Sequence, residues 1–409
     1  MKNTLLVTAD SVRADYCGFL GEPETTPFLS QLAEKSVVYE NAVSPGPRTP
    51  SSIALTTTGE RFRTNPDETN EGRLERIADH IKRFETIPES FSKQGYSTAA
   101  VTANPWTSTV TGFDELFDQF IGIGSGYGGD SNSGERSILD RGIDYFDQWR
   151  KGTDWFAQWP SFYSDIQRLT ETMPEPWFLW VFLMDTHSPY ILPRDHLHES
   201  NIATMAYSAL RYNASVMRGK DVSTLPSHLD RYLKQTYRDA IRSVDQFVQQ
   251  IYRDTPEETA LLFHSDHGEA FGEHGTYGHQ EQLYEENIHV PLLLYDGQTE
   301  GRIDQPVSTL EIPTLLAQAA REETAPESAT DSVVFSQTEF GDMRAARTPS
   351  YKFIRNGDGG ELYDLRKSPE EKMRLQTDDA EIFNEVIRAE FAPDAEKSKI
   401  VEAVRKAAL

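Results

Sequence analysis

Short apolar runs alternate with stretches of helical spacing along most of the chain. The runs Thr4–Ala9, Trp177–Met184 and Ala260–His264 are continuous and short, which predicts strands buried on both faces of a sheet. Leu233–Tyr252 has the spacing of a long amphipathic helix. Other strands are expected at 37–39, 98–102 and 290–295, and other helices from residue 26 and at 51–58 and 87–94. The alternation predicts an α/β fold with a mainly parallel central sheet covered by helices on both faces.

The pattern changes near residue 329. Short strands separated by turns are expected at 333–338, 345–346, 351–355 and 361–365, followed by a closing helix at 380–390. Such a series predicts a small antiparallel α+β subdomain. We therefore expect a main domain over residues 1–328 and a C-terminal subdomain over residues 329–409.

The composition indicates which binding partners, which cellular compartment and which salt conditions to expect. Acidic residues number 65 against 40 basic ones, and the net charge of −25 disfavours binding to nucleic acid or to anionic membranes. No apolar stretch is long enough to cross a bilayer, the start lacks the pattern of a secretory signal, and Cys17 is the only cysteine. These features predict a cytoplasmic protein, and the acidic, lysine-poor composition favours a halophilic one over an ordinary acidic enzyme.

Acidic residues follow three of the predicted buried strands. Asp10, Asp185 and Asp266 each come just after a strand, and ligands bind beyond the carboxyl ends of strands in such sheets. His267 stands next to Asp266, and a carboxylate beside an imidazole is a plausible metal-binding pair. The alternative for this pair is a polar turn at a helix start.

A hydroxyl group is expected at the start of the helix at 51–58. Thr49 lies after a Pro/Gly loop, where the N–H groups of a helix start favour negative charge. A metal ion there would make the alkoxide accessible, whereas the simpler alternative is that Thr49 is an N-cap. For Arg13 we favour an ion pair with Asp15 over a role in binding an anion.

Taken together, these segments resemble the sulfatase family of the alkaline phosphatase superfamily. Motifs in the family's order cover nearly the whole chain, and they are Leu6-Val7-Thr8-Ala9-Asp10, Thr49-Pro50-Ser51, Gly112-Phe113-Asp114, Asp185-Thr186-His187, Ser265-Asp266-His267-Gly268-Glu269, Tyr284-Glu285-Glu286 and Glu361-Leu362-Tyr363-Asp364-Leu365. The resemblance implies an alkaline-phosphatase-like fold. It also implies a metal-dependent hydrolase of phosphate or sulfate esters that acts on a small-molecule substrate.

The resemblance also assigns roles residue by residue. It implies that the metal ligands are Asp10, Thr49, Asp266 and His267, that the catalytic residues are Thr49, His187 and His279, and that His187, His279 and Asp185 bind substrate. Thr49 takes the nucleophile position. Trp106, Tyr190 and Arg48 are further candidates for shaping the pocket, although such residues are more often structural.

Departures from the family pattern affect the predicted chemistry. Sulfatases that use formylglycine carry Cys or Ser where Thr49 stands and Arg where Ser52 stands, and Thr cannot give formylglycine. The resemblance is then closer to members with a Thr nucleophile, which act on phosphate esters. The alternatives are a sulfuric ester hydrolase without formylglycine, a soluble phospho-alcohol transferase, and a catalytically degenerate protein that only binds esters.

The metal is expected to be Mn, Mg, Ca or Zn. Ser11 replaces a second Asp ligand of many sulfatases, which makes the site less like a Ca site. Asp185, His187 and His279 supply the residue types for a second ion, but their spacing favours one ion over two. Specificity is expected in the loops at 122–133, 155–163 and 201–225.

Overall fold

The computed structural model describes most of the chain. The described residues are 1–21, 24–62, 70–123, 158–216, 225–357, 359–376 and 379–392. The Gly/Ser-rich loop predicted at 122–133 lies almost wholly outside these ranges, as do residues 155–157 of the loop expected at 155–163. No helix in the described ranges is both long enough and apolar enough to cross a membrane.

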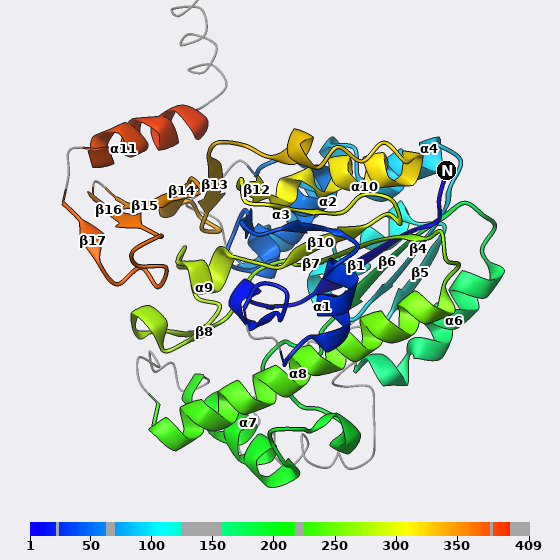
Figure 1. Ribbon diagram of the computed structural model, residues 1–409, viewed down its shortest axis with the longest axis horizontal. Coiled ribbons are helices and arrows are strands. Elements are labelled where there is room, and N and C mark those ends of the chain that lie inside the picture. Colours follow the sequence, from blue (N-terminus) through cyan, green and yellow to red (C-terminus); the bar gives the residue numbers. More distant parts are fainter. Residues whose placement is uncertain are drawn as a thin grey trace, which may run out of the picture.

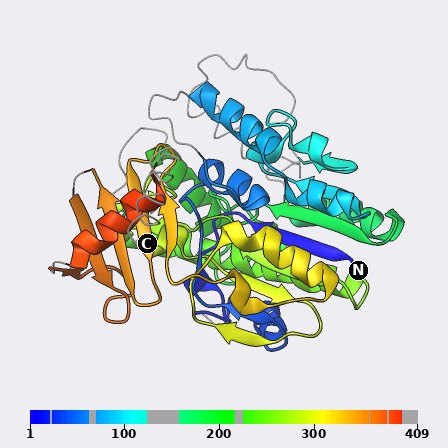
Figure 2. The same cartoon turned by 90° about the horizontal axis from the view of Figure 1, so that it is seen from above.

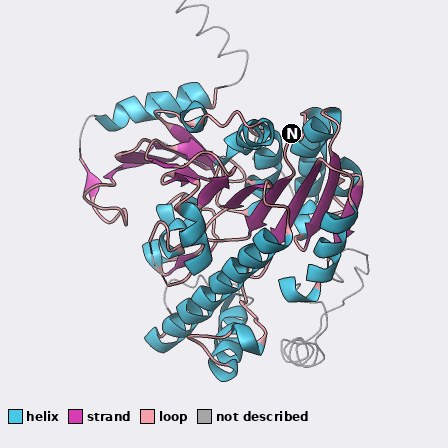
Figure 3. Cartoon of the chain, turned by 45° about the vertical axis from the view of Figure 1, so that its right-hand side comes forward, coloured by secondary structure: helices cyan, strands magenta, loops and turns pink. Residues whose placement is uncertain are grey.

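An eight-stranded sheet runs through the centre of the molecule (Figures 1 and 3). In spatial order its strands are β11 (Gly301–Ile303), β2 (Val37–Tyr39), β10 (Leu292–Tyr295), β7 (Ala260–Ser265), β1 (Thr4–Ala9), β6 (Trp177–Leu183), β4 (Ser97–Thr102) and β5 (Gln119–Gly122). All neighbouring pairs are parallel except the two made by β10. The predicted mainly parallel sheet is therefore confirmed.

Helices cover both faces of this sheet (Figure 1). One face packs against α1 (Pro27–Ala33), α6 (Tyr163–Thr172) and α8 (Ser227–Asp254), and the other against α2 (Ile53–Thr58), α3 (Asn70–Arg83), α4 (Ile87–Lys93) and α10 (Ile312–Arg321). Alternate residues of a strand point to opposite faces of the sheet and pack into the hydrophobic core on each face. In β1, for example, Leu5 and Val7 face the first set of helices and Leu6 faces the second. Strands buried on both faces explain the continuous apolar runs in the sequence.

The rest of the main domain consists of short elements and one more long helix. These are α7 (Ile202–Val216), α9 (Glu285–Ile288), β3 (Ala42–Val43), which pairs with β12 (Val307–Ser308), and β8 (Ala270–Phe271), which pairs with β9 (Tyr277–Gly278). The segment 201–225, read from the sequence as a loop, contains the helix α7. The long helix expected at 233–252 extends further at its start, as α8.

A separate antiparallel sheet lies beside the central sheet (Figure 2). It comprises β13 (Val334–Gln337), β14 (Met343–Arg347), β15 (Tyr351–Asn356), β16 (Gly359–Asp364) and β17 (Arg374–Leu375), and α11 (Asp379–Glu390) packs on it. Its elements match the predicted subdomain. The proposed domain boundary at residue 328 stays a prediction.

Buried ion pairs connect this sheet to α9 of the main domain. Glu285 accepts from Lys352 at 2.9 Å and pairs with Arg347 at 3.1 Å. Lys352, which is fully buried, also pairs with Glu371 at 2.9 Å. Burial alone would raise the pKa of Glu285. The positive charges of Arg347 and Lys352 outweigh that effect and hold this pKa well below its usual range. Removing one partner would leave an uncompensated buried charge, which is strongly destabilising.

Candidate active site

Two carboxylates meet where two neighbouring central strands end. Ala9 of β1 pairs with Ser265 of β7, so the next residues, Asp10 and Asp266, lie at the same level of the sheet. Both side chains are fully buried. The sequence prediction that strand ends bring these two residues together is therefore confirmed by the strand register.

The turn after Asp266 directs an imidazole toward the same point. His267 Nδ1 lies 2.9 Å from the Gly268 carbonyl oxygen, which can only accept, so Nδ1 carries the proton. The lone pair of Nε2 then faces the carboxylates, at 3.8 Å from Asp10 and 3.5 Å from Asp266. Gly268 allows this turn because a Cβ there would lie 2.1 Å from the Glu286 carbonyl oxygen.

The electrostatics of this trio fit a divalent cation. One ligand atom each from Asp10, Asp266 and His267 lies within 4.8 Å of the others. The Oδ2 atom of Asp266 is buried and has no hydrogen-bond partner among the described residues. Burial, with the Asp10 carboxylate beside it, raises the pKa of Asp266 well above its usual range. Two buried carboxylates and an imidazole nitrogen facing one point are costly without a cation and favourable with one.

Thr49 places its hydroxyl on the same trio. It begins a short 3-10 turn, Thr49–Ser51, after an extended residue, Arg48. Its Oγ1 lies 3.3 Å from Asp10 Oδ2 and 3.2 Å from His267 Nε2. Arg48 occupies the N-cap position of the turn, so the alternative that Thr49 is the N-cap does not hold.

Two further histidines, from different loops, adjoin the trio. The ring centroid of His279 lies 4.8 Å from that of His267 and 5.3 Å from that of His187. His279 Nδ1 lies 3.1 Å from a carboxylate oxygen of Glu269, whereas His187 Nδ1 meets the Ser188 carbonyl oxygen at 2.6 Å. Burial, with His267 and His187 nearby, holds the pKa of His279 well below its usual range. A neutral His279 therefore donates through Nδ1 to Glu269 and leaves Nε2 available.

Asn104 is a site residue that the sequence reasoning missed. Its Nδ2 donates to Asp10 Oδ2 at 2.9 Å, and its Oδ1 accepts from the Trp106 N–H at 2.9 Å. The residue follows β4, which pairs with β6, which pairs with β1. The missed signal was a polar residue just after a predicted buried strand, the same signal that identified Asp10.

Asp185 lies apart from the trio. Its carboxylate accepts from the Trp159 N–H at 3.3 Å and from Ser243 Oγ at 3.5 Å. Its part in substrate binding stays a prediction. Arg13 pairs with Asp15 at 2.8 Å, as expected, and also with Glu273 at 2.9 Å.

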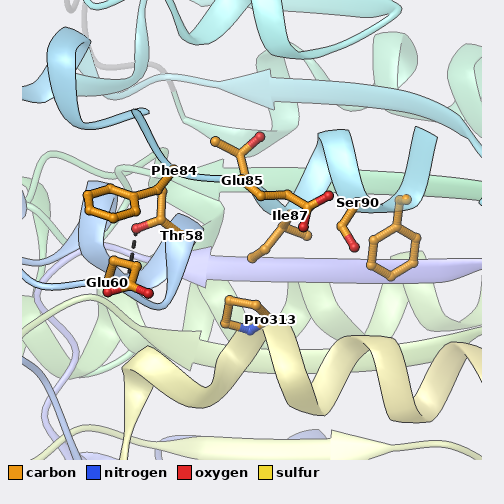
Figure 4. A pocket seen from close by; sticks show the side chains of 9 residues that line it. Thr58, Glu60, Phe84, Glu85, Ile87, Ser90 and Pro313 are labelled. Carbon is orange, nitrogen blue, oxygen red and sulfur yellow. Dashed lines mark hydrogen bonds between the residues drawn. The ribbon is translucent and has the colours of Figure 1, made fainter. Parts of the chain in front are cut away.

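A pocket of about 260 Å³ lies elsewhere, between α2, α4 and α10 (Figure 4). It is lined by Thr58, Glu60, Phe84, Glu85, Thr86, Ile87, Ser90, Phe91 and Pro313. No candidate catalytic residue lines it, so it takes no part in the site described here.

Known proteins share both the sequence pattern and the fold. The family model described as Sulfatase matches residues 2–321. The uncharacterized sulfatase YidJ of Escherichia coli (strain K12) is 22% identical over 438 residues, covering 92% of this chain and 83% of that protein. The phosphonate monoester hydrolase of Agrobacterium radiobacter has a TM-score of 0.67 at 15% identity, covering 100% of this chain and 96% of that chain. A 2-O GAG sulfatase has a TM-score of 0.64 at 17% identity, covering 99% and 90%.

Proposed function

The chain belongs to the sulfatase family, whose members are metal-dependent ester hydrolases, and from this premise we propose that Thr49 is its nucleophile and that phosphate esters are its preferred substrates. The resemblance to this family and the alkaline-phosphatase-like fold predicted from sequence are both confirmed. The structural neighbours include enzymes named for phosphonate and for sulfate chemistry, so the transferred group must be argued from the site itself.

The observation that carries the proposal is the position of the Thr49 hydroxyl. It lies 3.3 Å from one carboxylate and 3.2 Å from the imidazole of the trio. The hydroxyl is thus held where a cation on Asp10, Asp266 and His267 would be in reach. A divalent cation bound there would lower the pKa of the hydroxyl and polarise an oxygen of the ester.

The protein's own groups then account for the remaining steps. The Thr49 hydroxyl gives up its proton to solvent and attacks phosphorus in line, and the bond to the leaving oxygen breaks. His187, or His279 once its Nε2 has taken up a proton from solvent, protonates or stabilises that oxygen. Water, or a second alcohol, then attacks the threonine ester and releases the transferred group.

Phosphate is favoured over sulfate for a chemical reason. A formylglycine hydrate attacks with one hydroxyl and expels sulfate with the help of the other. Thr49 has one hydroxyl, so its ester must be released by external attack, which occurs readily at phosphorus beside a cation. The runner-up is a sulfuric ester hydrolase without formylglycine, which differs only in the transferred group.

One ion is proposed rather than two. Among the described residues, only the set of Asp10, Asp266 and His267 brings three ligand atoms within 4.8 Å of one another. Asp185, which the second set requires, is directed at Trp159 and Ser243 instead. Mn, Mg, Ca and Zn are the candidate ions, because the set mixes oxygen and nitrogen ligands.

A panel of chromogenic substrates tests the proposal. Aryl sulfate, aryl phosphate and bis-aryl phosphate esters are assayed with each of the four metals and with none. We expect a metal-dependent rate that is highest for a phosphate ester. Faster cleavage of sulfate than of any phosphate ester would overturn the substrate preference, and no turnover with any metal would favour a degenerate ester-binding protein.

A further inference from the structure

Three arginines and two glutamates form a continuous cluster beside Thr49, here called the arginine cluster. Glu339 pairs with Arg73 at 2.7 Å and with Arg76 at 2.9 Å, both on α3. The Glu339 N–H donates to Glu281 at 2.8 Å. Glu281 in turn contacts Arg48 at 3.5 Å. The cluster therefore joins α3 and the β13–β14 connection to the residue that precedes the proposed nucleophile.

Pairing within the arginine cluster is uneven. Glu339 is completely buried and holds its two arginines at short distances. The contact of Arg48 with Glu281 is at the limit of hydrogen-bond distance, and Glu281 already accepts from a backbone N–H. The Nε atom of Arg48 is buried and has no hydrogen-bond partner in the described part of the chain. Such a buried donor calls for an explanation, and a ligand is one.

The charge of the cluster is unusual for this protein. Among the described residues of the cluster, three guanidinium groups face two carboxylates, on a chain whose net charge is −25. Burial also raises the pKa of Glu281, although Arg48 opposes that effect. The side chain of Arg48 is 30% exposed, so a ligand has access to it. An anion near the nucleophile would find its complementary charge here.

The backbone directs Arg48 away from the reacting group. Arg48 is extended, with φ −150° and ψ 155°, so its side chain and that of Thr49 project to different sides. Thr49 faces the carboxylates and His267, whereas Arg48 faces Glu281. Arg48 therefore projects to a different side of the backbone from Thr49, and its charge still acts on His279, where it helps to lower the pKa.

From these observations we propose that Arg48 is a specificity-determining residue that binds a second oxyanion group on the substrate, such as a phosphate, sulfate or carboxylate. A guanidinium fork binds such groups through two parallel hydrogen bonds, displacing the weak contact with Glu281. The substrate class is then an ester that carries a second anionic group. The inference rests on the proposed function, because it takes the ester at Thr49 as the first group.

Calorimetric titration tests this proposal without relying on turnover. The Thr49→Ala protein, loaded with Mn²⁺, is titrated with glucose 6-phosphate and with glucose 1,6-bisphosphate. The same titrations follow in proteins that add Arg48→Ala, Arg48→Lys or the control Arg321→Ala. Arg321 is exposed at the end of α10, next to Ala320, which accepts from the N–H of Lys2 just before β1 begins, whereas the candidate site lies where β1 ends.

We expect the bisphosphate to bind about tenfold tighter than the monophosphate, in line with one charge-assisted contact. Arg48→Ala should remove that preference by weakening bisphosphate binding about tenfold with little effect on the monophosphate. Arg48→Lys should keep part of the preference, and Arg321→Ala all of it. An equal loss for both ligands, or an unchanged preference in Arg48→Ala, would overturn the proposal.

The outcomes separate this proposal from the previous one. Continued phosphate release by the Thr49→Ala protein would defeat Thr49 as nucleophile, yet the ratio of the two affinities would still report on Arg48. Melting temperatures check that each variant is folded. If Arg48→Ala fails to fold, Arg48→Lys decides, because an unchanged ratio in a protein that lacks the guanidinium fork contradicts the bidentate contact.

Discussion

Replacing Thr49 by Ala should separate activity from stability. The hydroxyl makes two contacts, of 3.3 and 3.2 Å, in a residue that is 4% exposed. Long hydrogen bonds of this kind contribute about 0.5–1.5 kcal/mol each, so the variant should lose at most about 3 kcal/mol of stability. Loss of a covalent nucleophile should cost at least about a hundredfold in kcat, or about 2.7 kcal/mol in the barrier.

Two companion variants identify the group responsible. Thr49→Ser keeps the hydroxyl and should retain part of the rate, whereas Thr49→Val keeps the shape of the side chain and should behave like Thr49→Ala. Initial rates on an aryl phosphate ester give kcat and KM, and thermal unfolding followed by circular dichroism confirms the fold. Rapid quenching of the wild type should trap a phosphorylated Thr49.

A specific result would refute this reasoning. If Thr49→Ala and Thr49→Val kept nearly the full rate, the hydroxyl would serve only local structure. The attacking group would then be a water molecule at the trio. A hundredfold loss accompanied by collapse of the melting temperature would instead show that the contacts of Thr49 with Asp10 and His267 hold the site together.

Three other changes have outcomes that the site predicts. Purified protein should carry about one divalent ion per chain by elemental analysis, and Asp266→Ala should lose both the ion and activity while it keeps a native circular-dichroism spectrum. Burial raises the pKa of Asp185 to about 7, above its unfolded value, so its stabilising contribution is present at low pH and is lost as pH rises through about 7. Relative to Asp185→Asn, the wild type should therefore lose about 3 kcal/mol of unfolding free energy between pH 5 and pH 8. The loss builds up over the two pH units below the pKa of about 7, at about 1.4 kcal/mol each. Urea titrations measure it, and a difference between the two proteins that does not change with pH would contradict this prediction. The melting temperature should rise from low salt to molar KCl, because screening reduces repulsion among the acidic side chains, and a flat or falling value would argue against a halophilic protein.

Strand register explains how much of the site could be predicted from sequence. Asp10 and Asp266 each directly follow a strand, and β1 and β7 are parallel neighbours in register, so both carboxylates reach one point. The apolar runs of these strands are continuous, which made their ends easy to locate. The resemblance to the family added Thr49, whose approach depends on contacts across 39 residues of chain and leaves no local signal.

The same register explains the two residues whose contacts could not be predicted. Ala9 pairs with Leu183, so Asp10 is level with Met184, and Asp185 lies one residue further. Successive side chains of an extended segment point to opposite sides, which directs Asp185 toward Trp159 instead of the trio. Thr102 pairs with Phe182, so Asn104 is level with Met184 and with Asp10. Sequence alone gives neither the spatial order of strands nor this one-residue offset.

The charge of the whole chain and that of the arginine cluster act on an anionic substrate in opposite directions. At low ionic strength the net charge of −25 repels such a substrate over distances far longer than a contact. Salt at about 0.1 M shortens the range of that repulsion to about 10 Å, whereas a half-buried pair at contact distance is screened much less. Salt should therefore remove the long-range penalty while it leaves most of the attraction of Arg48. An acidic surface and a cationic group beside the nucleophile are thus compatible in a saline environment, where recognition depends on the local charge.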